Sequence, residues 1–328
     1  MKTRLVTPSG FILMMFAALI LLMTNRASVR AMPVKLSFMA KSEGLWKKQI
    51  FLIGDFHSSD AESAQEGLKV LRQTDLFFKT FILNKKSKNI GPVPLIWEQG
   101  VRPELNSNHK TYINLKAAEF SNCKEHCLPF KYYAGDRVRR TDKVLTKFLL
   151  DSLYRPNQAV NQLKKMPFRR KLHESILKSV PPGKKHLLRR YTQEVIQNKS
   201  IPLAIRKSIL SNFKWYEHQV THILNSLKFK HGAVWNPINL HQIRNTLVHC
   251  SEDLELLLNI FRTKEPLVVV YAGTGHIKRI QNLLHRSGFQ SFFDVENQSY
   301  LSEGDFRQFR KYIPYSLSMQ NQVATNQR

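Results

Sequence analysis

The chain has 328 residues, 42% of them hydrophobic and 23% charged, which suits a globular protein with a full α/β core and room for further helices. This composition excludes a protein built from several membrane spans. Three cysteines are too few for a disulfide framework; Cys123 and Cys127 are spaced to close one small loop in an oxidising compartment, and the sequence leaves open whether they do.

An apolar run from Phe11 to Met23 follows Lys2 and Arg4 near the start of the chain. A transmembrane helix needs about 20 apolar residues, so this run is short for a span. Small residues up to Ala31 suit a cleavage region instead. Residues 1–31 are therefore predicted to be a signal peptide or an N-terminal anchor. The protein is expected to be exported or membrane-associated, in the periplasm or cell envelope or secreted.

Short apolar runs separated by polar loops predict strands at 49–53, 95–98, 130–134, 267–271 and 289–295. Helical spacing of apolar residues follows several of them. The predicted fold class is α/β, with a mixed or mostly parallel sheet flanked by helices. The sheet comes from two segments, a first α/β half at 32–140 and a second at 263–300, and residues 301–328 form a C-terminal tail.

Residues 141–262, between the two halves, are predicted to form a basic helical insertion or cap. Over 141–250 there are 20 lysine and arginine residues against five acidic ones, within a net charge of +27. This excess predicts attraction to an anionic surface, either a membrane or an envelope polymer. A nucleic acid is not the predicted partner, because zinc-finger spacing, an aromatic RNA-binding stretch and a heptad zipper are all missing. Whether the region is a lid, a docking surface or both stays open.

Two Gly-x-x-His motifs each end a predicted strand: Gly54-Asp55-Phe56-His57 and Gly273-Thr274-Gly275-His276. Open α/β sheets bind their ligands at the carboxyl ends of the strands. The two imidazoles are therefore expected to meet at one site. Glu98 ends the predicted strand at 95–98, and Asp136 with Arg137 follows the strand at 130–134, so these side chains are expected at the same edge.

Imidazole and carboxylate are good ligands for zinc, manganese or cobalt, so His57, Glu98 and His276 are predicted to hold a divalent ion and its activated water. Arg137 would stabilise negative charge on the substrate. Gly54, Asp55, Asp136 and Gly273 are expected to support the site, with Asp55 orienting an imidazole or joining the ligands. Without an ion, His57 would act as general base and Glu98 would hold its tautomer. Each residue also has a purely structural interpretation: a histidine that binds a loop, or an arginine of the basic surface.

These motifs resemble the TraB/Tiki superfamily, which includes erythromycin-esterase-like and ChaN-like proteins. The resemblance covers roughly 49–140 and 253–295. It implies an α/β fold with a divalent-metal hydrolase site, as in Tiki-like proteases. Erythromycin-esterase-like members hydrolyse an ester with a histidine, ChaN-like members bind haem, and TraB-like members restrain a peptide. Residues 141–250 match no part of the family pattern.

Together, the motifs and the resemblance predict a metal-dependent hydrolase of TraB/Tiki type that acts on a peptide or ester bond. Two alternatives stay open. One is a non-catalytic protein of the same fold that binds haem or a peptide. The other is an adaptor that docks on an anionic surface through its basic helices.

Overall fold

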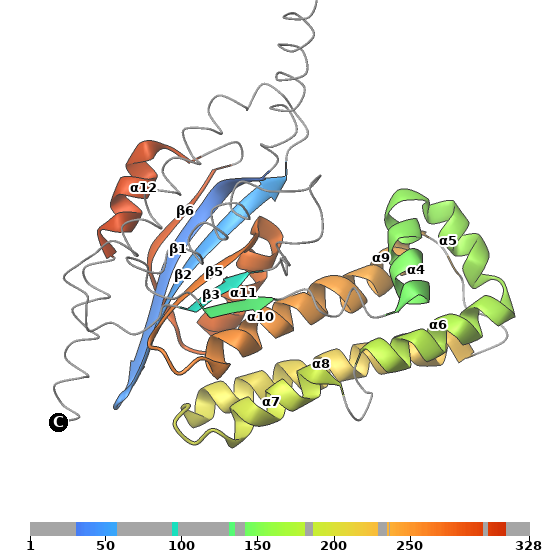
Figure 1. The fold of residues 1–328 in the computed structure, drawn as a ribbon, viewed down its shortest axis with the longest axis horizontal. Helices are drawn as coiled ribbons and strands as arrows, with labels where there is room; N and C mark the ends of the chain where they lie inside the picture. The colour runs from blue at the N-terminus through green and yellow to red at the C-terminus, as the bar shows by residue number, and fades with distance from the viewer. Residues whose placement is uncertain are drawn as a thin grey trace, which may run out of the picture.

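The structure is a computed structural model that describes residues 31–57, 94–97, 131–134, 142–180, 186–228, 235, 237–297 and 301–312. The strands in these ranges form one six-stranded sheet in the order β4-β3-β5-β2-β1-β6. Strand β1 pairs antiparallel with both of its neighbours, so the other five run in one direction. The prediction of an α/β fold with a mixed, mostly parallel sheet is confirmed. Figure 1 shows the sheet at one side of the molecule and helices extending away from it.

A long hairpin of β1 (Ala31–Glu43) and β2 (Trp46–His57) occupies one half of the sheet, where the sequence predicts only a strand at 49–53. Its turn contains Gly44 at φ 59°, in the left-handed region that glycine tolerates best. Residues 34–38 alternate strictly between apolar and polar side chains, which is typical of a strand, so β1 was missed although its pattern is present in the sequence. Its polar positions Lys35 and Ser37 are buried as well. Lys35 is balanced by an ion pair of 2.8 Å with Asp294 on the neighbouring strand.

Four strands end at the same edge of the sheet. Strands β3 (Pro94–Trp97), β4 (Lys131–Ala134) and β5 (Leu267–Gly273) join β2 in a parallel block. Trp97 pairs with both Ala134 and Tyr271, and Asp55 pairs with Gly273. The carboxyl ends of these strands therefore lie side by side, which is the arrangement that a strand-end site requires.

Helices cover both faces of the sheet (Figure 1). Helix α10 (Ser251–Arg262) and helix α11 (Thr274–Arg286) pack on one face, where Ile277 and Ile280 join a core with Leu52. Gly288 follows α11 at φ 84°, the left-handed conformation in which many helices end. Strand β6 (Gln290–Glu296) confirms the last predicted strand. Helix α12 (Glu303–Arg310), in the segment predicted as a tail, covers the other face, with Phe309 edge-on to Phe51 at 5.1 Å.

The helices between β4 and β5 form an arm that points away from the sheet (Figure 1). They are α4 (Lys143–Tyr154), α5 (Pro156–Leu163), α6 (Met166–Ser179), α7 (Leu187–Gln197), α8 (Leu203–Lys228), α9 (Pro237–Arg244) and the π-helical turn η4 (Asn245–Cys250). Turn η4 runs directly into α10, which connects the arm to the sheet. Within the ranges above, no helix combines the length and apolar composition that crossing a membrane needs.

Candidate metal centre

The two Gly-x-x-His motifs lie against each other at the shared edge of the sheet. Thr274 donates a hydrogen bond from Oγ1 to the carbonyl of Asp55 at 2.7 Å. A Cβ atom on Gly54 would lie 3.1 Å from the Cα of Thr274 and 3.1 Å from the Cβ of Lys35. Only a glycine lets the first motif approach the start of α11 this closely. The prediction that both strand ends share one edge is confirmed for the backbone.

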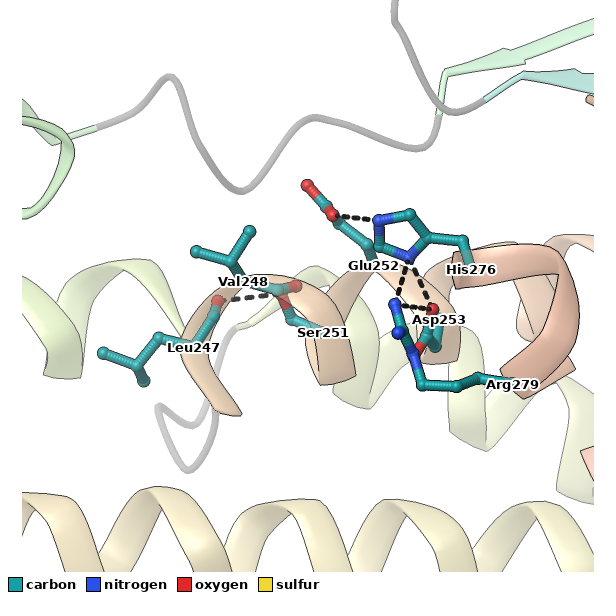
Figure 2. Close-up of polar contacts among 7 residues, drawn as sticks. All are labelled: Leu247, Val248, Ser251, Glu252, Asp253, His276 and Arg279. Atoms are coloured by element: carbon teal, nitrogen blue, oxygen red, sulfur yellow. Dashed lines mark hydrogen bonds and ion pairs between the residues drawn. The ribbon is translucent and has the colours of Figure 1, made fainter. Parts of the chain in front are cut away.

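His276 lies in the first turn of α11 with its imidazole between two carboxylates of α10. Its Nδ1 is 2.6 Å from Asp253 Oδ1, and its Nε2 is 3.0 Å from Glu252 Oε2. All three side chains are buried, with exposed fractions of 6%, 5% and 2%. Figure 2 shows Glu252 and Asp253 at opposite nitrogens of the ring. The site is therefore built where α10 and the start of α11 face each other.

Arg279, one turn after His276, holds Asp253 in place. Its Nε donates to Asp253 Oδ2, and its Nη2 lies 3.4 Å from Oδ1 of the same carboxylate (Figure 2). The same Asp253 carboxylate faces the His276 ring, and its Oδ1 can accept a hydrogen bond from Nδ1. In the tautomer with its proton on Nδ1, His276 donates to Asp253, and Nε2 keeps a lone pair for a metal ion. Arg279 Nη2 also lies 3.1 Å from Nδ1, so Arg279 contacts both the ring and the carboxylate.

His249 completes a group of three ligand side chains. One nitrogen of His249, a carboxylate oxygen of Glu252 and a nitrogen of His276 all lie within 4.8 Å of one another. The His249 and His276 rings are 5.4 Å apart at their centroids and tilted by 55°. Two imidazoles and one carboxylate are a ligand set that catalytic zinc sites use, with one position left for water or substrate.

The ligand spacing arises at a junction between two kinds of helix. His249 belongs to the π-helical turn η4, and Glu252 to the first turn of α10. Ser251, buried between them, donates from Oγ to the carbonyls of Leu247 at 2.9 Å and Val248 at 2.8 Å (Figure 2). Its hydroxyl satisfies backbone carbonyls at the change of helical register. Single π-helical turns occur often at functional sites, because they re-aim the side chains of a helix.

The site is buried and rich in carboxylates. Glu255, one turn beyond Glu252, is 1% exposed and brings a third carboxylate into the start of α10. Burial raises the pKa of the neighbouring Cys250 thiol to about 11, and the charge of Asp253 adds to the rise. In the absence of a bound ion, Cys250 is therefore protonated at neutral pH. Excess carboxylate charge in a buried site favours a bound cation.

A cavity of about 450 Å³ opens beside Asp253 and Arg279, between α8, α10 and α11. Trp215 and Leu283 give it apolar walls, and Asn282 adds a polar group. This volume lies in the range of small-molecule sites. The cavity borders the Nδ1 side of His276, opposite the side that faces Glu252.

The structure brings His276 into a ligand group, but with partners that the sequence did not predict. The side chain of His57 and the residues Glu98, Asp136 and Arg137 lie outside the described part of the chain, as do Cys123 and Cys127. His57 is the last residue of β2, and Glu98 directly follows β3 in sequence. Asp55 is 7% exposed, at the end of β2 next to Gly273.

His249 and Glu252 were missed because a His-x-x-Glu spacing on a helix is common and carries little information by itself. A second sign was present, since Glu252, Asp253 and Glu255 follow a long region that is poor in acidic residues. Comparisons with models of protein families, with curated proteins and with solved structures find no match to this chain.

Proposed function

We propose that this protein is a divalent-metal-dependent hydrolase of peptide or ester bonds, with the ion held by His249, Glu252 and His276. The observation that carries the proposal is the convergence of these three ligand atoms within 4.8 Å in a buried site. The resemblance of the two Gly-x-x-His motifs to the TraB/Tiki pattern supports the same reaction class.

The residues present fit a divalent ion in both charge and arrangement. Ligand atoms on a tetrahedral zinc ion are roughly 3.3 Å apart for bonds of about 2.0 Å, so the three side chains would draw slightly closer on an ion. Asp253 and Arg279 supply the hydrogen bond that orients a ligating histidine. An ion held this way supplies Lewis acidity and a hydroxide nucleophile at neutral pH.

The ends of the neighbouring strands favour a substrate-binding region next to this centre. Strands β2, β3 and β4 end at the edge where β5 passes into α11. In sequence, the predicted site residue His57 ends β2, Glu98 directly follows β3, and Arg137 comes shortly after β4. In the proposal, His57 or Glu98 takes a proton from the attacking water, and Arg137 stabilises the charge that develops on the substrate.

The alternative for the same cluster is a metal-free one, in which His276 is an imidazolium bridging Glu252 and Asp253. This arrangement belongs to the non-catalytic alternative, a protein that binds haem or a peptide without turnover. Metal content separates the two, because an imidazolium with both nitrogens protonated has no lone pair for an ion.

The test is the metal content of the purified full chain, measured by mass spectrometry, together with turnover of a panel of peptides and esters. We expect about one equivalent of metal in the native protein. Metal content and turnover should both fall at least tenfold in His249→Ala, Glu252→Gln and His276→Ala. The control is His218→Ala, which removes an exposed histidine of α8 and should change neither quantity.

Two results would contradict the proposal. The first is a native protein without metal that gains none on incubation with zinc, manganese or cobalt. The second is turnover that persists with chelator in all three ligand variants. A Soret band after haem addition that depends on His276 would favour the binding-protein alternative. Loss of turnover in His57→Ala with metal content unchanged would support the predicted role of His57.

A further inference from the structure

Helices α4–α6, at the end of the arm, carry an exposed surface that is predominantly positively charged. Eight basic side chains are exposed between Lys143 and Ser179, whereas Glu174 is the only exposed acidic side chain in that range. Asp151 is buried. The basic residues are Lys143, Lys147, Arg155, Lys164, Lys165, Arg170, Lys171 and Lys178. Such a surface attracts anions, but charge alone does not choose among them.

Large apolar side chains are exposed on the same helices, and three of them are adjacent on α4. Leu150 is 52% exposed, Leu153 51% and Tyr154 74%. At 100° per residue, Lys143, Lys147, Leu150 and Tyr154 lie within about 60° of one another around the helix, with Leu153 at its flank. We call these five residues the α4 face. It has two lysines in its first half and an apolar group in its last turn.

The α4 face is held rigidly by the opposite side of the helix. Leu145 and Phe148 are buried in the core of the arm. Asp142 caps the helix by accepting hydrogen bonds from the backbone of Val144 at 2.9 Å and Leu145 at 3.1 Å, and it also contacts Ser175 of α6. Helix α4 lies at the end of the arm that is far from the sheet (Figure 1). The face therefore lies far from the proposed hydrolytic centre.

We propose that the α4 face docks on an anionic lipid membrane, with the apolar group entering the headgroup region and the basic side chains of α4–α6 contacting the lipid charges. The combination selects the partner. Basic residues near an anionic leaflet and an apolar group that inserts beside them are the two features of interfacial membrane binding. A nucleic acid would use the lysines and arginines but would gain nothing from two exposed leucines. Docking at this end leaves the sheet edge accessible to substrate.

This inference does not depend on the proposed hydrolase. Membrane binding is measured without turnover, and the variants lie outside the ligand group. The experiment uses the full chain with vesicles of phosphatidylcholine, alone or with 30% phosphatidylserine, at about 0.15 M salt. Co-sedimentation gives the affinity, and amide hydrogen exchange shows which segment becomes protected.

We expect tighter binding to the phosphatidylserine vesicles, weakening with salt, and slower exchange in the last turns of α4 when they are present. The apolar variant Leu150→Ser/Leu153→Ser/Tyr154→Ser should bind the phosphatidylserine vesicles at least tenfold more weakly than the native chain. The charge variant Lys143→Gln/Lys147→Gln should lose at least fivefold. The matched control is Leu203→Ser/Lys207→Gln/Lys214→Gln, which removes one exposed leucine and two exposed lysines from α8 and should bind like the native chain. Unchanged thermal unfolding identifies the variants that keep their fold.

Three results would overturn the proposal: equal affinity for both kinds of vesicle, a control variant that loses as much as the apolar variant, or vesicle binding without protection of α4. Binding to a DNA duplex that matches vesicle binding and survives the apolar changes would assign the surface to nucleic acid instead.

Discussion

Replacing Gly54 with alanine tests whether close contact between the two motifs shapes the site. Gly54 has no positive φ, so the cost of this change is one of space and not of backbone conformation. The added Cβ would meet the Lys35 Cβ and the Thr274 Cα at 3.1 Å each, and the Thr274 Oγ1 at 3.3 Å. Carbon atoms in contact are normally about 3.5–4.0 Å apart, so either β1 or the start of α11 has to move by a few tenths of an ångström.

Neither neighbour moves freely. Lys35 is tied to Asp294 by its ion pair, and the Thr274 atom is backbone at the start of a packed helix. Inserting a methyl group into such a contact costs about 1–3 kcal/mol of unfolding free energy. His276 lies two residues after Thr274, so a displaced α11 also disturbs the 3.0 Å contact between His276 and Glu252. We therefore expect lower stability in urea unfolding and weaker zinc binding in titration calorimetry.

Gly275→Ala is the matched control for this prediction. The nearest atom to its added Cβ would be Arg279 Nη1 at 3.4 Å, at the end of a flexible side chain. Alanine is also favoured over glycine inside a helix by up to about 1 kcal/mol. Gly275→Ala should therefore be as stable as the native chain or more stable. The reasoning is refuted if Gly54→Ala unfolds at the native urea concentration, or if both alanine variants lose stability equally.

Three further changes test neighbouring parts of the argument. Asp253→Asn removes the carboxylate that accepts from His276 Nδ1 and should weaken zinc binding about 10–100-fold. The circular dichroism spectrum should stay unchanged. A variant that binds zinc with native affinity would show that Asp253 does not position the ring. Ser251→Ala leaves two carbonyls at the η4–α10 junction without the hydroxyl and should cost about 1–2 kcal/mol in urea unfolding, whereas the control Ser200→Ala, on an exposed turn, should cost less than half of that. Burial lowers the pKa of Lys48 to about 7, although the charge of Glu265 acts in the opposite direction. A lysine in the unfolded chain has a pKa near 10.4, so between these two values the unfolded chain binds a proton that the folded chain has released. Stability should therefore rise from about pH 7 to pH 9.5, by about 3 kcal/mol for this group, and Lys48→Met should remove that rise; an identical pH slope in the two proteins would contradict it.

Sequence patterns predict the parts of this fold that depend on neighbouring residues. The run Leu267–Tyr271, the glycine after it and the apolar spacing beyond His276 predict one strand, its end and the next helix, and β5 and α11 confirm them. Strand β1 was not predicted, although Val34 to Phe38 alternate between apolar and polar residues as strands do. The sequence does not reveal that Lys35 and Ser37 are also buried, because their partners Asp294 and Gln281 are distant in sequence.

The sequence by itself determined that a histidine follows β5 at the edge of a mostly parallel sheet, because strand periodicity and glycine placement are local properties. Only the tertiary structure decided which side chains surround that histidine. Glu252 and Asp253 contact His276 because α10 packs beside α11, and the π-helical turn before α10 brings His249 to the same place. These contacts depend on the packing of one helix against another, to which residues throughout both helices contribute, and no short motif encodes it.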